Sequence, residues 1–216
     1  MMTLPTFIAF TGVDDAVSAV DLQALSARYP IEWGMLLDAA QESDPLFPVA
    51  EARGQLIAAP GLRWAAHVCG AQARLIADAP GEAAIDLSGF QRVQVNHGFS
   101  GSSAAQIVNV IRFGRALGVR SLLQTLRDFP DEPRLDWLFD VSFGTGAKPA
   151  TWPPLPESGA FCGYSGGINP GNATAVVAAI AAPPGAQYWI DMESGVRTAG
   201  RFDLDKCEAV CRAVYG

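Results

Sequence analysis

The sequence predicts an α/β protein of the (β/α)8 TIM barrel class, with residues 1–216 forming a single barrel domain. Short apolar runs rich in β-forming residues alternate with longer amphipathic stretches, which is the pattern of strands followed by helices. Eight such runs occur in 216 residues, an average of 27 per unit, which is enough for a strand, a helix and two loops. The runs are nearly continuously apolar, as are parallel strands buried on both faces. Eight parallel units most naturally close into a barrel.

The predicted strands cover residues 6–11, 31–38, 62–69, 90–96, 119–124, 135–141, 160–166 and 186–192. Helical periodicity is clearest at residues 14–29, 103–118, 172–182 and 204–215. The segments "DFPDEPR" (128–134) and "KPATWPPLPESG" (148–159) are rich in proline, which disrupts a helix interior. We therefore expect the fifth and sixth helices to be reduced to loops. A doubly wound open sheet is the alternative, but "TGVDDA" after the first strand is not the GxGxxG fingerprint of that fold.

The charge balance limits the classes of partner. The formal net charge is −7 and the isoelectric point is about 4.7, which argues against an extended nucleic-acid surface. No apolar run approaches the roughly 20 residues that a membrane-spanning helix needs, so we expect no membrane partner. The first residues, "MMTLPTFIAF", lack the basic start of a signal peptide, so a cytoplasmic protein is expected. The oligomeric state stays open.

The sequence contains few cysteines and histidines that could bind a metal. None of the four cysteines forms a CxxC pair, so reduced, buried thiols are expected. Cys207 and Cys211 are four apart on a helix and either pack into the core or share a metal. With two histidines in the chain, a histidine-based metal site is poorly supported, and we expect neither a metal nor another cofactor.

Polar side chains collect where the predicted strands end, which is where (β/α)8 enzymes carry their active sites. Residues two apart on a strand share a face. His67 and Cys69 are such a pair, as are Gln94 and Asn96. These side chains form either the site of a polar ligand or a mutually hydrogen-bonded network. The residues in question are Asp38, His67, Cys69, Gln94, Asn96, Gln124, Asp140 and Asp191.

Two glycine-containing loops follow the seventh and eighth predicted strands. In "YSGGINPGN" (164–172), Asn169 suits a helix N-cap and Pro170 the first helical position, so the loop would offer free amides at a helix start. "MESGVR" (192–197) offers amides in the same way. Loops at these two places commonly hold a phosphate in this fold. The predicted phosphate-binding residues are Gly166, Gly167, Ile168, Ser194, Gly195 and Val196.

Several motifs resemble those of phosphoribosylanthranilate isomerase, the (β/α)8 enzyme of tryptophan biosynthesis. "LFDVSFGTGAKPATW" resembles the family's aspartate, G-T-G loop and tryptophan. "GYSGGINPGN" resembles its A-G-G-L-x-P-x-N segment, and "IDMESGVR" its D-V-S-S-G-V-E. "FDLDKCEAV" and "VQVNHG" are similar to its K-D-x-x-K-I and V-Q-L-H-G. These motifs span most of residues 90–216.

The resemblance implies an intramolecular oxidoreductase that performs an Amadori rearrangement of a phosphorylated sugar amine, without a cofactor. The family's general acid, an aspartate after the sixth strand, corresponds to Asp140. Its general base, a cysteine on the first strand, corresponds to Thr11 in "AFTGVDD", and a threonine hydroxyl is too weak an acid to serve as that base. The family's substrate-binding arginine after the second strand is also replaced, by "SDPLFPV".

Other residues are therefore candidates for the base. They are His67 and Cys69, with Asp38 and Asp191 as further options. Asp38, Gln94, Asn96 and Thr11 are expected to contact substrate. Glu193 shares a face with Asp191, and two neighbouring carboxylates can raise one pKa or bind a divalent ion with waters.

Two alternative functions remain open. One is a different phosphoester enzyme, an epimerase or lyase, with Asp38, Asp191 and Glu193 carrying the chemistry. The chain has only Lys148 and Lys206, neither near a strand end, which argues against Schiff-base aldolase chemistry. The other is a non-catalytic relative that retains the phosphate site. Asp140 would then only cap the turn that follows it.

Overall fold

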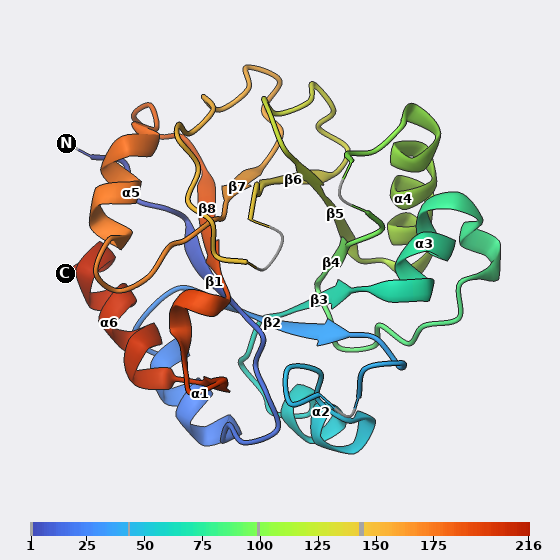
Figure 1. Cartoon of the computed structure of the whole chain (residues 1–216), viewed down its shortest axis with the longest axis horizontal. Helices are drawn as coiled ribbons and strands as arrows, with labels where there is room; N and C mark the ends of the chain where they lie inside the picture. Colours follow the sequence, from blue (N-terminus) through green and yellow to red (C-terminus); the bar gives the residue numbers. More distant parts are fainter. Residues whose placement is uncertain (1, 43, 99, 143–144) are drawn as a thin grey trace.

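Eight parallel strands form a closed barrel, in sequence order, in the computed structural model, which describes residues 2–42, 44–98, 100–142 and 145–216 (Figure 1). This confirms the predicted (β/α)8 class. The strands are β1 (Phe7–Thr11), β2 (Ile31–Leu37), β3 (Trp64–Val68), β4 (Arg92–Val95), β5 (Arg120–Thr125), β6 (Asp136–Phe139), β7 (Cys162–Tyr164) and β8 (Tyr188–Met192). β1 pairs with β8, and this pairing closes the sheet.

The α-helices surround the barrel (Figure 1). They are α1 (Ala19–Ser26), α2 (Ala50–Ile57), α3 (Gly70–Asp78), α4 (Ala104–Leu117), α5 (Ala173–Ile180) and α6 (Leu204–Tyr215). Within the described residues no helix lies between β5 and β6 or between β6 and β7, which confirms that the fifth and sixth helices are reduced. Two short 3-10 helices, η1 (Pro80–Glu82) and η2 (Ser194–Val196), and a hairpin of β9 (Arg197–Thr198) and β10 (Arg201–Phe202) complete the fold.

Helix α5 begins later than the sequence predicts. Asn169 is not its N-cap, because the helix starts at Ala173, after a turn over residues 170–172. The Asn169 side chain accepts a hydrogen bond from the Gly171 amide at 2.9 Å, and the Asn172 side chain accepts one from the Asn169 amide at 2.9 Å. These two local asparagine turns use the backbone donors that a helix start at Pro170 would have left free.

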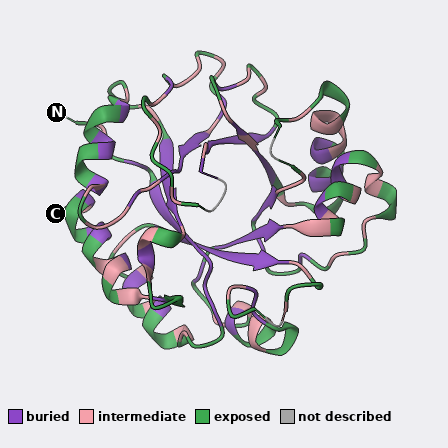
Figure 2. Ribbon diagram, viewed as in Figure 1, coloured by how far each residue is buried: buried purple, intermediate pink, exposed green. Residues whose placement is uncertain are grey.

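The barrel interior contains an apolar layer. Alternate residues of each strand point inward, and Phe7, Ala9, Leu122, Leu138 and Trp189 form a buried cluster separate from the larger core between strands and helices. Burial colouring shows the strands as an almost continuous buried ring (Figure 2). This layer fills the barrel, so it is a packed core below the polar residues at the strand ends.

A buried ion cluster lies at the opposite, amino-terminal ends of the strands. Arg92, 4% exposed, contacts Glu32 at 2.9 Å and Asp136 at 3.2 Å, and its guanidinium lies 4.2 Å from the centre of the Trp189 ring. The Asp136 contact is close enough for an ion pair but is not aligned as a hydrogen bond. Because this end of a (β/α)8 barrel serves stability, we treat the cluster as structural.

None of the helices in the described part of the chain combines the length and the apolar character needed to cross a membrane.

Candidate active site

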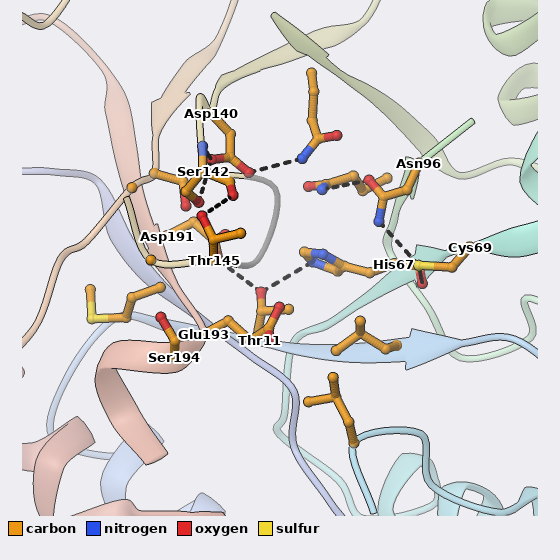
Figure 3. A pocket seen from close by; sticks show the side chains of 18 of the residues that line it. Thr11, His67, Cys69, Asn96, Asp140, Ser142, Thr145, Asp191, Glu193 and Ser194 are labelled. Atoms are coloured by element: carbon orange, nitrogen blue, oxygen red, sulfur yellow. Dashed lines mark hydrogen bonds between the residues drawn. The ribbon is translucent and has the colours of Figure 1, made fainter. Parts of the chain in front are cut away.

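A cavity of about 600 Å³ lies at the carboxyl ends of the strands. It is lined by residues from the strand ends and from the loops that follow them. Most of the residues predicted from the sequence are among them, including Thr11, Asp38, His67, Cys69, Gln94, Asn96, Gln124, Asp140, Gly166, Gly167, Ile168, Asp191 and Ser194. Figure 3 shows how side chains of the lining lie around it, ten of them labelled. A volume of this size accommodates a small molecule.

Two of the predicted phosphate-binding positions differ from the expectation. Gly195 and Val196 do not line the cavity. The Val196 amide donates to Glu193 O at 3.2 Å and is therefore not free for a ligand. Gly195 packs so closely on Ile168 that a side chain there would overlap the Ile168 carbonyl oxygen. Gly144 of the expected G-T-G loop lies outside the described residues.

A hydrogen-bonded row connects three strands at the bottom of the cavity. The Thr11 hydroxyl, on β1, donates to Asp191 Oδ1, on β8, at 2.7 Å. Thr11 Oγ1 also lies 3.3 Å from His67 Nε2, on β3 (Figure 3). While Asp191 is ionised, the single hydroxyl proton is directed at it, and the His67 contact then places a proton on Nε2. His67 then has no lone pair on that nitrogen with which to accept a proton.

Gly34 on β2 makes this row possible. A side chain at Gly34 would bring a carbon 2.7 Å from Thr11 Oγ1 and 2.9 Å from His67 Nε2, so only glycine lets β1 and β3 side chains meet across β2. We expect Gly34→Ala to lower the free energy of unfolding by about 1–3 kcal/mol through overpacking. The measurement is urea unfolding of both proteins.

Gly54→Ala is the matched control, because the space around Gly54 in α2 is open. Alanine is a better helix former, so that variant should gain roughly 0.5–1 kcal/mol. A Gly34→Ala protein as stable as the wild type would contradict the close contacts assigned to Gly34.

Asp140 follows β6 and points toward the cavity (Figure 3). Its carboxylate accepts hydrogen bonds from the Ser142 amide and hydroxyl, both at 2.7 Å, and from Gln124 Nε2 at 3.1 Å. The bond from the Ser142 amide is the turn-capping interaction that is the alternative role of Asp140. Asp140 makes this bond and also lines the cavity. Three donors hold the carboxylate in one orientation, which a group that transfers protons requires.

Burial changes the proton affinity of the candidate bases in opposite directions. Desolvation, with a further contribution from Arg92, lowers the pKa of His67 to about 3, so the ring is neutral at physiological pH and only weakly basic. Burial raises the pKa of the Cys69 thiol, so it carries little thiolate at neutral pH. Asn96 Nδ2 donates to Cys69 Sγ at 3.4 Å.

The two carboxylates of β8 and its loop are strongly affected. Desolvation raises the pKa of Asp191 to about 7, opposed by the Thr11 hydrogen bond and reinforced by Asp140, Glu193 and Glu32. Burial also raises the pKa of Glu193, opposed by Arg197. A carboxylate that titrates near neutral pH can both take and release a proton under physiological conditions.

The glycine loops meet above the ends of β7 and β8. A side chain on Gly167 would lie 2.8 Å from Gly146 O, and one on Gly146 would lie 2.8 Å from Ser194 Oγ. The loop after β6 therefore packs on both loops predicted to bind phosphate. Gly166, Gly167, Ile168 and Ser194 still line the cavity.

The charges of the lining are unevenly distributed. The described lining residues include four carboxylates, Asp38, Asp140, Asp191 and Glu193, but one arginine, Arg74, and no lysine. Arg74 was not predicted from the sequence, because the prediction considered residues at strand ends and Arg74 lies on α3. The prediction also missed Ser142 and Ser165, although Ser165 directly follows β7. Among the described residues no group of three or more potential ligands could hold a metal ion.

No protein-family model matches the sequence, and no curated protein matches it. Several solved structures match over nearly the full length. The phosphoribosylanthranilate isomerase of Pyrococcus furiosus is 16% identical, with a TM-score of 0.61 and coverage of 97% of this chain and 98% of that one. The enzyme of Thermococcus kodakaraensis is 17% identical, with a TM-score of 0.57 and coverage of 96% and 98%.

The dimeric enzyme of Thermotoga maritima, solved as monomers, is 12% identical, with a TM-score of 0.53 and coverage of 99% and 100%. Identities this low establish a common fold and leave the reaction to be argued from the site. The chain has a phosphoribosylanthranilate isomerase-like (β/α)8 barrel fold.

Proposed function

We propose that the protein is an isomerase that converts a phosphorylated aldose amine into the corresponding ketose, with Asp140 and Asp191 as its proton-transfer pair. One observation carries the proposal. Asp191 lies 2.7 Å from the hydroxyl of Thr11, the residue that corresponds to the family's base cysteine. Its pKa of about 7 suits a base at neutral pH. A carboxylate from β8 thus replaces a thiolate from β1.

The reaction needs two proton transfers at adjacent carbons. Asp140 donates a proton to the ring oxygen, the bond from this oxygen to C1 breaks, and the nitrogen lone pair forms a C1–N iminium. Asp191 then removes the proton from C2, which leaves an enolamine. The C2 hydroxyl loses its proton and C1 gains one, so the ketose forms with no net gain or loss of protons. No co-reactant is needed.

Backbone amides supply the proposed phosphate contacts. Gly167, Ile168 and Ser194 line the cavity, and their N–H groups bind an anion without adding a side-chain charge. Thr11 and Gly34 act on the reaction indirectly. Thr11 orients the Asp191 carboxylate, and Gly34 leaves the space that the Thr11 side chain needs.

The first test is turnover of freshly prepared phosphoribosylanthranilate, followed by the loss of anthranilate fluorescence. We expect the wild type to exceed the uncatalysed rate and Asp140→Asn to lose about a hundredfold in kcat, because the amide keeps the shape but donates no acidic proton. Asp21→Asn, at an exposed position of α1, is the matched control and should retain full activity.

The opposite result has a clear reading. A folded wild type that binds phosphate esters without turnover would refute the isomerase and favour an epimerase, a lyase or a non-catalytic phosphate-binding relative.

A further inference from the structure

The side-chain carbonyl oxygen of Gln94 lacks a hydrogen-bond donor within the described part of the chain. Gln94, on β4, lines the cavity and is 3% exposed. Its Nε2 donates to Asn96 Oδ1 at 2.9 Å, while Oε1 is buried and finds no partner among the described residues. A buried acceptor without a donor is unfavourable, and the loss is recovered when a ligand supplies an N–H or O–H.

Acceptors also dominate the opposite wall. Asp140, Asp191 and Glu193 come from β6, β8 and the loop after β8, and the pKa of both Asp191 and Glu193 is raised partly by the charge of Asp140. These groups repel one another, so a cation placed among them is attracted by all three. Among the described lining residues Arg74 is the one arginine and there is no lysine, so carboxylates outnumber cations; Arg197 acts on Glu193 but is not among the charges that act on Asp191.

The two walls are connected through neighbouring strands. Gln94 is the register partner of His67 on β3, His67 contacts Thr11, and Thr11 donates to Asp191. His67 is neutral and therefore does not compete as a cation. The polar bottom of the cavity thus offers mainly acceptors to a ligand.

We propose that the substrate is an amino sugar that carries a basic amine apart from the nitrogen at C1, and that this protonated amine binds to Gln94 Oε1 and to the carboxylates of Asp191 and Glu193. An ammonium group has three donors and no acceptor, and its hydrogen bonds to carboxylates are charge-assisted. The sugar hydroxyls supply further donors. The proposal takes the sugar class from the proposed function and adds the recognition of a positive charge.

The test is calorimetric binding of four matched probes to the full chain: glucosamine, glucose, and the 6-phosphate of each. Within each pair the ligands differ only in an ammonium or a hydroxyl group at C2. We expect the amino member of each pair to bind about tenfold more tightly or better, as one charge-assisted hydrogen bond provides. Gln94→Met and Glu193→Gln should each reduce this preference.

Glu51→Gln is the control, because Glu51 is exposed on α2 and is not part of the cavity lining. It should leave the preference unchanged. Equal affinities within each pair, tighter binding of the hydroxyl member, or no binding of any probe would overturn the proposal. A clear amino preference without turnover of phosphoribosylanthranilate would support it while refuting phosphoribosylanthranilate as the substrate of the isomerase, so the two failures are distinguishable.

Discussion

Asp191→Asn is expected to lower kcat about a thousandfold or more while leaving the fold intact. Asparagine keeps the size of the side chain and can still accept the Thr11 hydrogen bond, which is 2.7 Å long in the wild type. It cannot take the proton from C2, and this is the difficult step because carbon acids are weak. General-base catalysis contributes about 10²–10⁴-fold, so the expected loss lies in the upper part of that range.

The pH dependence gives a second readout of the same residue. The base must be ionised to act, and the pKa of Asp191 is raised to about 7. The ionisation of Asp191 should therefore appear as a rise of the wild-type kcat/KM as pH increases through about 7, since this ratio reports the free enzyme. In Asp191→Asn this step should disappear. The charged groups that contribute to the wild-type value are Asp140, Glu193 and Glu32.

Glu193→Gln is the informative companion variant. It removes a negative charge that raises the pKa of Asp191, so the midpoint of the pH profile should shift to lower pH. Its kcat should fall much less than that of Asp191→Asn. If Asp191→Asn retains kcat within tenfold of the wild type and keeps the wild-type profile, Asp191 is not the base.

Arg92→Ala is expected to produce the largest loss of stability, about 3–5 kcal/mol. Arg92 is buried between Glu32 and Asp136, and its removal leaves two carboxylates in the barrel interior without their buried partner. It also removes the contact of the guanidinium with Trp189 at 4.2 Å. Urea unfolding of the wild type and the variant measures the effect. The slope of the free energy of unfolding against urea concentration should be the same for both proteins.

Arg63→Ala is the matched control because Arg63 pairs with the same Glu32, at 3.4 Å, from a side chain that is 51% exposed. Solvent screens such a pair, so the loss should stay below about 1 kcal/mol. Combining Arg92→Met with Glu32→Gln and Asp136→Asn should recover most of the stability, since the uncompensated charges are then gone. A loss below 1 kcal/mol for Arg92→Ala would show that the cluster does not support the barrel.

Much of the fold follows from local patterns in the sequence. Each of the eight apolar runs became a strand because a parallel strand buried on both faces requires an apolar sequence. The proline segments at 128–134 and 148–159 correctly indicated where helices are missing. The start of α5 could not be read in this way, because a turn over residues 170–172, held by the Asn169 and Asn172 side chains, precedes the helix.

The sequence by itself determined which side chains share a strand face, because alternation along a strand is a local property. It therefore brought His67 and Cys69, and Gln94 and Asn96, to the mouth of a barrel. Only the tertiary structure decided which of these groups touch. Thr11 and Asp191 are 180 positions apart and meet because β1 pairs with β8 when the barrel closes.

The proton affinity of the site was likewise decided by the tertiary structure. Burial of His67 and Asp191 depends on every strand around them, and it lowers the pKa of the histidine while raising that of the aspartate. The sequence favoured His67 and Cys69 as bases and offered Asp191 only as a further option. The low-dielectric interior of the closed barrel favours the uncharged form of each, and this makes Asp191 the stronger candidate.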